Sequence, residues 1–182
     1  MFKKVLVSLF VIGFIFVSIV MYNHNQEPSR EDVFKSTKKW SRPATKVLFL
    51  ERIDDSWLTI IRMGHGVAIA RLEENSLGLW RVKQLLSSVH YPPAADDEEI
   101  TWGASGDGQG NTYYFGQIIN PKIKRLTVEN KRKIYDDVHL FNVNGDHFFF
   151  KEVNEEMELP INIEAYSESG EVIYSSVSPV KK

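Results

Sequence analysis

The N-terminal stretch from Val5 to Tyr22 carries no charged residue, and it places the strongest constraint on how this chain folds. As an α-helix its 18 residues extend about 27 Å at a rise of roughly 1.5 Å per residue, which matches the hydrocarbon core of a bilayer. A helix of a soluble core has a polar face, and this stretch has none. Residues 1–22 are therefore predicted to form a transmembrane helix that contacts the membrane through residues 5–22.

Two interpretations of this segment compete, a retained anchor and a cleaved signal peptide. Cleavage needs small residues before the cut, whereas the end of the stretch, Val17 to Tyr22, is mostly bulky. The chain also lacks the cysteine of a lipoprotein signal. We predict a retained anchor, and the alternative is a domain secreted after signal cleavage.

The positions of the basic residues predict the orientation. Lys3 and Lys4 precede the span, and the next lysine or arginine is Arg30. The positive-inside rule then keeps the N-terminus in the cytoplasm and puts the C-terminal domain outside. The predicted location is the cell membrane, with a single pass and an extracytoplasmic domain.

Composition narrows the chemistry of the rest of the chain. The 182 residues include 22 lysines and arginines, 24 acidic residues and no cysteine, for a formal net charge of −2. Without cysteine there is no disulfide, thiolate nucleophile or cysteine-ligated metal. The charge argues against nucleic acid as a partner. We predict no cofactor, no metal site and no catalytic residue.

Residues 23–45 are predicted to form a polar spacer and a short juxtamembrane helix. Ser29 and Asp32 resemble a capping box at the start of this helix. An apolar face that includes Trp40 would dock it on the domain. Arg42-Pro43 is expected to end it, because the residue before a proline leaves the α region.

Residues 46–176 alternate between short strand patterns and turn signals, which predicts a mainly β extracytoplasmic domain. Strand patterns within residues 46–84 predict a four-stranded meander. Asn144-Gly145 predicts a two-residue type I′ hairpin turn, because both central residues of that turn need positive φ. We expect an antiparallel β-sandwich or two packed small sheets.

The remaining segments have weaker patterns. Residues 85–99 are predicted to form a loop, with a helical turn over Val82 to Ser88 as an alternative, and this loop is a candidate subdomain boundary. Residues 177–182 are predicted to be a frayed tail.

The glycine-rich run of residues 103–111 lacks the features of a known ligand loop. A phosphate-binding loop needs Gly-Lys-Ser/Thr and a following helix, and a strand pattern follows here. A nucleophile elbow around Ser105 needs glycine where Asp107 stands. The run is therefore interpreted as a flexible, exposed strand connection.

Two further clusters suggest metal or acid–base chemistry, each with a plainer interpretation. His139 and His147 flank the predicted hairpin and would face each other across it, as a catalytic or metal pair or as a polar cross-strand pair. A second cluster offers oxygen ligands for calcium or, more simply, solvated acids. It consists of Asp96, Asp97, Glu98, Glu99, Asp107 and Asn111.

A cationic stretch is the candidate binding surface. Outside the membrane it would favour anionic wall polymers or lipid headgroups. A charged edge strand that prevents aggregation accounts for the same residues and is the favoured alternative. The candidates are Lys122, Lys124, Arg125, Lys131, Arg132 and Lys133.

Two aromatic runs, Phe148-Phe149-Phe150 and Tyr113-Tyr114-Phe115, put aromatic rings on both faces of their strands. They indicate either an exposed binding patch or, more commonly, packing between sheets.

The order of these patterns resembles a group of uncharacterised single-anchor or secreted proteins of Gram-positive bacilli. The resemblance covers most of residues 29–174 and implies an anchor and one β domain, without an activity. The pieces that carry it are Ser29-Arg30-Glu31-Asp32, Lys46-Val47-Leu48-Phe49, Gly78-Leu79-Trp80-Arg81-Val82, Ile100-Thr101-Trp102, Tyr113-Tyr114-Phe115-Gly116-Gln117-Ile118 with Asn120-Pro121-Lys122-Ile123-Lys124, and Ile163-Glu164-Ala165-Tyr166 with Ser169-Gly170-Glu171-Val172.

The sequence thus predicts a binding or accessory module for an envelope protein or polymer. One alternative is an envelope hydrolase that uses Ser105, Asp107 and a histidine. Another is a non-catalytic subunit of a membrane complex, in which the span itself contributes packing.

Overall fold

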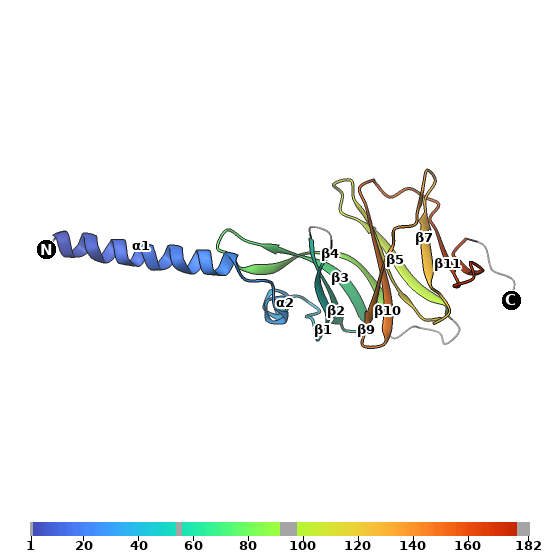
Figure 1. Cartoon of the computed structure of the whole chain (residues 1–182), viewed down its shortest axis with the longest axis horizontal. Coiled ribbons are helices and arrows are strands. Elements are labelled where there is room, and N and C mark those ends of the chain that lie inside the picture. Colours follow the sequence, from blue (N-terminus) through green and yellow to red (C-terminus); the bar gives the residue numbers. More distant parts are fainter. Residues whose placement is uncertain (1, 54–55, 92–97, 178–182) are drawn as a thin grey trace.

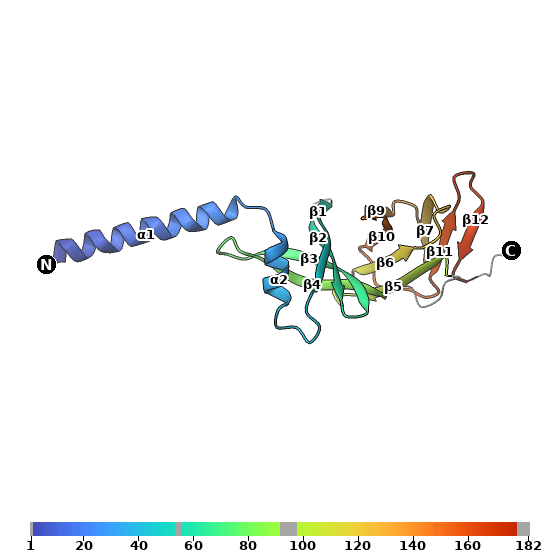
Figure 2. The ribbon, with the colours of Figure 1, turned by 90° about the horizontal axis from the view of Figure 1, so that it is seen from below.

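The computed structural model describes residues 2–53, 56–91 and 98–177. The chain is mainly β: an apolar N-terminal helix and a short second helix precede three small antiparallel sheets of four strands each. These parts follow one another along the long axis of the molecule (Figure 1), and the perpendicular view agrees (Figure 2). The predicted fold class is confirmed, although the described strands form three packed sheets instead of two.

Sheet A is the predicted meander. In spatial order it contains β1 (Lys46–Ile53), β2 (Ser56–Met63), β3 (Gly66–Glu74) and β4 (Trp80–His90). Leu58, Ile60 and Ile69 belong to the core shared with sheet B. Ala68 and Ala70 face the other way, toward the short helix, so the alternation of side chains gives sheet A two apolar faces.

Helix α2 (Arg30–Thr37) covers the outer face of sheet A. The predicted capping box is present, since Ser29 N–H donates to Asp32 Oδ2 at 2.9 Å and Asp32 N–H donates to Ser29 Oγ at 3.3 Å. Val33 and Thr37 are fully buried. The helix ends before the expected Pro43, because Thr37 Oγ1 accepts a hydrogen bond from Ala44 N–H at 3.3 Å and the intervening chain folds back.

Sheet B is buried on both faces. Its spatial order is β5 (Ile100–Gly106), β6 (Thr112–Ile118), β10 (Asp146–Val153) and β9 (His139–Val143). Phe148 and Phe150 pack against sheet A, whereas Phe149 packs against the third sheet. Gly116 makes room for Phe149, because a Cβ at Gly116 would collide with that ring. Packing between sheets is therefore the correct interpretation of the aromatic triplet, and each buried ring contributes roughly 1.5–3 kcal/mol.

Sheet C lies beyond sheet B. It contains β12 (Val172–Ser175), β11 (Asn162–Tyr166), β7 (Arg125–Glu129) and β8 (Ile134–Tyr135), in that order. The predicted turn at Asn144-Gly145 joins β9 to β10, and both residues have positive φ, 55° and 93°. That prediction is confirmed.

The chain after residue 84 differs from the prediction of a loop or helical turn. Strand β4 continues to His90 and pairs with β3 throughout, ending with Gly66 opposite His90. Leu86 and Val89 are buried in the core between sheets A and B, so the strand is retained by packing despite its serines. Residues 92–97 of the proposed subdomain boundary lie outside the described residues.

Helix α1 (Phe2–His24) projects from the sheets, and it is the one described helix long and apolar enough to cross a membrane, as a signal anchor or a signal peptide does. Its C-terminal end contacts the tip of the β3–β4 hairpin. Asn23 Nδ2 donates to the carbonyl of Leu77 at 3.1 Å, and His24 Nδ1 lies 2.9 Å from Glu74 Oε1. The helix is thereby attached to the domain at two points of its last turn.

Candidate functional site

Sheets A and B are closed along one side, where β4 crosses β5. Ser87 Oγ donates to the carbonyl of Gly103 at 3.2 Å, and Ser105 donates its hydroxyl to the carbonyl of Leu86. A Cβ at Gly103 would lie 2.9 Å from the carbonyl oxygen of Ser88, so only glycine permits this approach. We call this the closed side.

The opposite side is open. There the edge strand of sheet A, β1, and the edge strand of sheet B, β9, run along the same flank of the molecule (Figure 2). Phe49 and Phe141 meet between them with ring centroids 4.8 Å apart. Cavities of about 220 Å³ and 410 Å³ lie beyond the two ends of this contact. We call the first the Ser56 cavity and the second the Glu51 cavity, after residues that line them.

Strand β9 presents a free edge on this open side. Among the described residues it pairs only with β10. In a two-residue hairpin the pair next to the turn, here Val143 and Asp146, exchanges hydrogen bonds, and the pattern alternates from there. The N–H and C=O groups of Leu140 and Asn142 therefore point outward, and both residues are exposed.

A third cavity lies on the opposite face of β9. It has a volume of about 220 Å³ and is lined by Leu140 and Asn142, by apolar side chains that include Ile123, and by Lys124 and His147. We call it the Leu140 cavity. The edge of β9 thus has two cavities on the face of sheet B that packs on sheet A, and one on the face that packs on sheet C. A strand added to this edge would direct alternate side chains to the two faces and so into these cavities.

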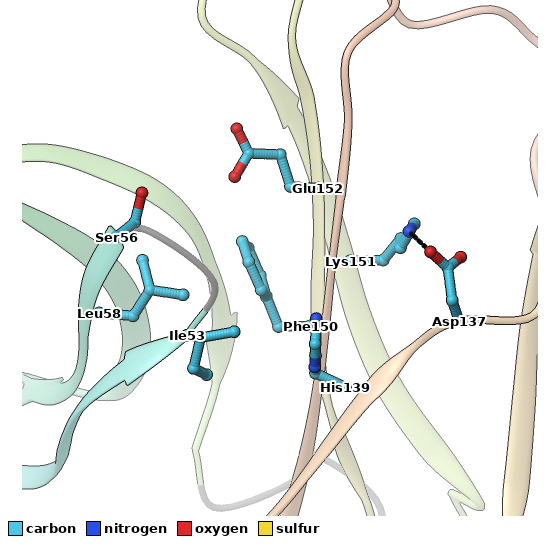
Figure 3. A pocket seen from close by; sticks show the side chains of 8 residues that line it. All are labelled: Ile53, Ser56, Leu58, Asp137, His139, Phe150, Lys151 and Glu152. Carbon is cyan, nitrogen blue, oxygen red and sulfur yellow. Dashed lines mark ion pairs between the residues drawn. The ribbon is translucent and has the colours of Figure 1, made fainter.

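The Ser56 cavity has apolar side chains from both sheets, and the ion pair of Lys151 and Asp137 lies across β10 from Phe150 and Glu152 (Figure 3). Ile53, Leu58 and Phe150 line it together with His139 and Glu152. Lys151 Nζ lies 2.6 Å from Asp137 Oδ2, and this hydrogen bond holds the pKa of Asp137 below its usual range.

Both carboxylates of this cavity have cationic partners. Glu152 pairs with Arg71 Nη2, and Asp137 pairs with Lys151. A general base works best with a pKa near the operating pH, and the hydrogen bond from Lys151 lowers the pKa of Asp137 away from that range. Asp137 is therefore poorly suited to act as a general base.

The six predicted cations do not form one surface. Lys122, Lys124 and Arg125 precede or begin β7, whereas the other three follow its end. Strand β7 pairs with β11 along its length and with β8 at Val128 and Glu129, whereas β8, which directly follows Lys133, is the edge strand of sheet C. The cations lie at the two ends of β7, whereas Leu126, Thr127 and Val128 within the strand are buried.

Three of these cations are engaged within the protein. The Arg125 guanidinium lies 3.9 Å from the centre of the Tyr166 ring, Arg132 pairs with Glu158 at 2.5 Å, and Lys133 Nζ lies 5.0 Å from the Tyr135 ring. Lys133 also lines a groove that contains the acids Asp136, Asp137, Glu152 and Glu155. Of the six, only Lys124 lines a cavity beside β9.

The glycine-rich loop is a self-contained turn that connects β5 to β6. The carboxylate of Asp107 accepts hydrogen bonds from Asn111 Nδ2 at 2.6 Å, from the N–H of Gln109 at 2.7 Å and from Tyr113 OH at 3.0 Å. These bonds, led by that from Asn111, hold the pKa of Asp107 far below its usual range. Burial and the bond to Asp107 raise the pKa of Tyr113 to about 12.

Two of the residues proposed for a hydrolase have hydrogen-bond partners within the protein. The hydroxyl of Ser105 is committed to a main-chain carbonyl on the closed side, and Asp107 organises its own turn. Strand β5 extends to Gly106, further than the glycines of residues 103–106 suggested, because its pairing with β6 continues to Thr112.

The other two hypotheses on metals or acid–base pairs are also wrong for the residues described. Glu99 accepts from Asn120 Nδ2 at one end of β5, while Asp107 lies beyond the other end, so they cannot share a calcium ion. Asp96 and Asp97 lie outside the described residues. His147 is opposite Asn142 and His139 is opposite Phe150, so the two histidines face opposite sides of the sheet.

Comparison with known proteins adds no assignment. No protein family model matches the chain, and neither a curated protein nor a solved structure matches it.

Sequence reasoning missed the edge of β9 as a site. The chain before the Asn144-Gly145 turn contains two strands, β8 and β9, with Asp136 and Asp137 between them, and only His139–Val143 pairs in sheet B. The two adjacent acids, Asp136 and Asp137, were the available signal in the sequence. Their meaning depends on which strand neighbours β9, and that is a property of the fold.

Proposed function

We propose that this chain is a single-pass, extracytoplasmic binding module that holds an extended, acidic segment of an envelope protein along β9 and catalyses no reaction. The free edge of β9 between cavities on both of its faces carries the proposal. Backbone groups of Leu140 and Asn142 supply the hydrogen bonds of strand addition, and the cavities select alternate side chains of the segment.

The basic residues of the Leu140 cavity favour an acidic side chain of the partner there. Lys124 and His147 line the Leu140 cavity, and Lys122 is exposed two residues before Lys124. An aspartate or glutamate of the segment that enters this cavity would meet a lysine beside an apolar wall formed by Ile118 and Ile123.

A proline at Leu140 tests the edge. Short random peptides would be selected on the full chain in lipid nanodiscs, and their affinities measured for variants. Leu140→Pro removes an outward N–H without removing a bond to β10, so peptide affinity should fall by about tenfold or more, since 1.4 kcal/mol corresponds to tenfold. Leu140→Thr keeps the N–H and controls for the side chain.

Equal affinities of the wild-type chain and Leu140→Pro, with unchanged melting temperatures, would remove β9 as the site. Loss of binding in Leu140→Thr as well would assign recognition to the leucine side chain and contradict pairing through the backbone.

Charge reversal tests the acidic preference. Lys124→Glu should weaken binding of acidic peptides by about 0.2–1 kcal/mol, with a larger effect at low salt. Lys131→Glu is the matched control, because Lys131 is also exposed but lies beyond the far end of β7. Equal effects of both variants would indicate a general charge effect and contradict a site at the Leu140 cavity.

Retention of α1 is part of the proposal, and the contact between its last turn and the hairpin supports it. Asn23 and His24 bind hairpin groups, so removal of the helix together with these residues would expose part of the domain. Mass spectrometry of the chain from native membranes should find residues 1–22 present, and protease added to wall-stripped cells should digest the domain. A mature chain that starts after residue 22, or a protected domain, would contradict this part.

Two exposed lysines at the end of the molecule opposite α1 support a second candidate function, the binding of an anionic envelope polymer. Lys122 and Lys131 are exposed at the two ends of β7, which lies at the opposite end of the molecule from α1 (Figure 1). If α1 spans the membrane, these lysines lie farther from the bilayer than its own lipid headgroups do. Salt-sensitive retention on purified anionic wall polymer, lost in Lys122→Glu/Lys131→Glu, would support this function, and salt-independent retention would contradict it.

A further inference from the structure

The β3–β4 hairpin ends in a turn that has two exposed leucines. Leu77 is 43% exposed and Leu79 is 49% exposed. The turn is well organised, because Asn75 Oδ1 accepts hydrogen bonds from the N–H groups of Leu77 at 2.9 Å and Leu79 at 3.0 Å. The hydrogen bonds of the turn therefore hold both leucines on the outside of the domain.

The same turn is fitted to the end of α1. Gly78 has a φ of 75°, and a Cβ there would lie 2.6 Å from both Asn23 Cβ and the backbone nitrogen of His24. Trp80 Nε1 donates to the carbonyl of Gln26 at 2.7 Å, in addition to the bonds made by Asn23 and His24. The tip of the hairpin is therefore fixed beside the last turn of α1.

The length of α1 sets the level of this contact relative to a bilayer. If Val5 to Tyr22 cross the hydrocarbon core, the next residues, Asn23 and His24, lie among the lipid headgroups. Tyr22, which is 66% exposed, is then at the depth where aromatic side chains gather in membrane proteins. The hairpin tip must lie at the same depth, because it touches Asn23 and His24.

From these contacts we infer that the β3–β4 hairpin is a second membrane contact, whose Leu77 and Leu79 enter the lipid interface next to α1. This inference rests on the proposed insertion of α1. The occupant of the leucine surface is lipid, because the turn that carries both leucines is attached to Asn23 and His24, which directly follow Tyr22 and hold it at the interface. The hairpin then fixes the tilt and rotation of the domain and holds sheet C away from the membrane.

The absence of cysteine makes the depth of single residues measurable. The full chain, with one cysteine at Phe14, Leu77, Leu79 or Leu85 and an environment-sensitive fluorophore on it, would be reconstituted in vesicles of equal parts phosphatidylcholine and phosphatidylglycerol. Lipids with a spin label at a shallow or a deep acyl position would serve as quenchers. Leu85 is the matched control, since it is a similarly exposed leucine (40%) on the same hairpin, further along β4.

We expect a shift to shorter wavelength and quenching by the shallow label at positions 77 and 79, quenching by the deep label at position 14, and neither effect at position 85. Quenching at position 14 without quenching at 77 and 79 would overturn the hairpin contact and leave the anchor intact. Absence of quenching at position 14 would overturn the anchor and, with it, this inference. Equal quenching at 77, 79 and 85 would also overturn it, because the whole domain would then lie on the membrane.

Discussion

The two sides of the layer formed by sheets A and B differ in the size of the residues at their edges. On the closed side, Gly103 and Ser87 let β4 and β5 approach until side chains bond to backbone carbonyls. On the open side, Phe49 and Phe141 meet between β1 and β9 and hold the strands apart. Small edge residues thus close a pair of sheets, whereas bulky ones leave an edge that another chain can use.

The largest expected effect concerns the core next to the closed side. Leu86 is 1% exposed and belongs to the core between sheets A and B. Leu86→Ala should lower the free energy of unfolding by about 2–5 kcal/mol, because it leaves a cavity where the sheets are tightly joined. Chemical denaturation would measure this change. A loss as small as that of a surface substitution would mean that the closed side is not tightly packed.

A smaller effect is expected for the close approach of β4 and β5. Gly103→Ala should cost about 1–3 kcal/mol, since its Cβ would press on the Ser88 carbonyl. Gly106→Ala in the same strand is the control, because its Cβ would meet only Asn111 at an ordinary 3.5 Å, and it should change stability by less than about 0.5 kcal/mol. Equal effects of the two substitutions in denaturation would contradict a glycine requirement specific to the closed side.

The smallest effect concerns the open side and depends on pH. Lys151 lowers the pKa of Asp137 in the folded chain, so the pair stabilises the fold above about pH 4, the ordinary aspartate range, and this contribution is lost as the pH falls through the folded pKa. Asp137 is largely exposed, so Asp137→Asn should cost roughly 0–1 kcal/mol at neutral pH.

Melting temperatures measured from neutral pH down to acid would test this prediction. The difference between the wild-type chain and Asp137→Asn should shrink as the pH falls below 4. A difference that stays constant across this range would show that the ion pair does not contribute through its charge.

Local signals predicted the local parts of this fold. Asn144-Gly145 predicted its turn, Ser29 and Asp32 predicted a helix start, and the triplet Phe148-Phe149-Phe150 predicted burial on both faces of a strand. Each of these depends on backbone preferences or on the alternation of neighbouring side chains.

The number of sheets and the candidate site depended on contacts between distant segments. Residues 85–90 contain two serines before a proline pair and suggested a loop, but packing of Leu86 and Val89 keeps them in a strand. In the sequence the cationic residues 122–133 suggested one surface, but in the structure strand β7 separates them into two groups. The edge of β9 is a candidate site only because β1 lies across from it, and no local pattern encodes that neighbour.

Photo-crosslinking from the two sides tests the central claim most directly. A photoreactive residue at Leu140 on the open side and one at Leu85 on β4 of the closed side differ little in exposure, 45% and 40%. In intact native cells the residue at 140 should crosslink to one extended stretch of a partner polypeptide, and Asn142→Pro should abolish this product. Crosslinks of equal yield from both positions, or from position 85 alone, would contradict recognition at the edge of β9.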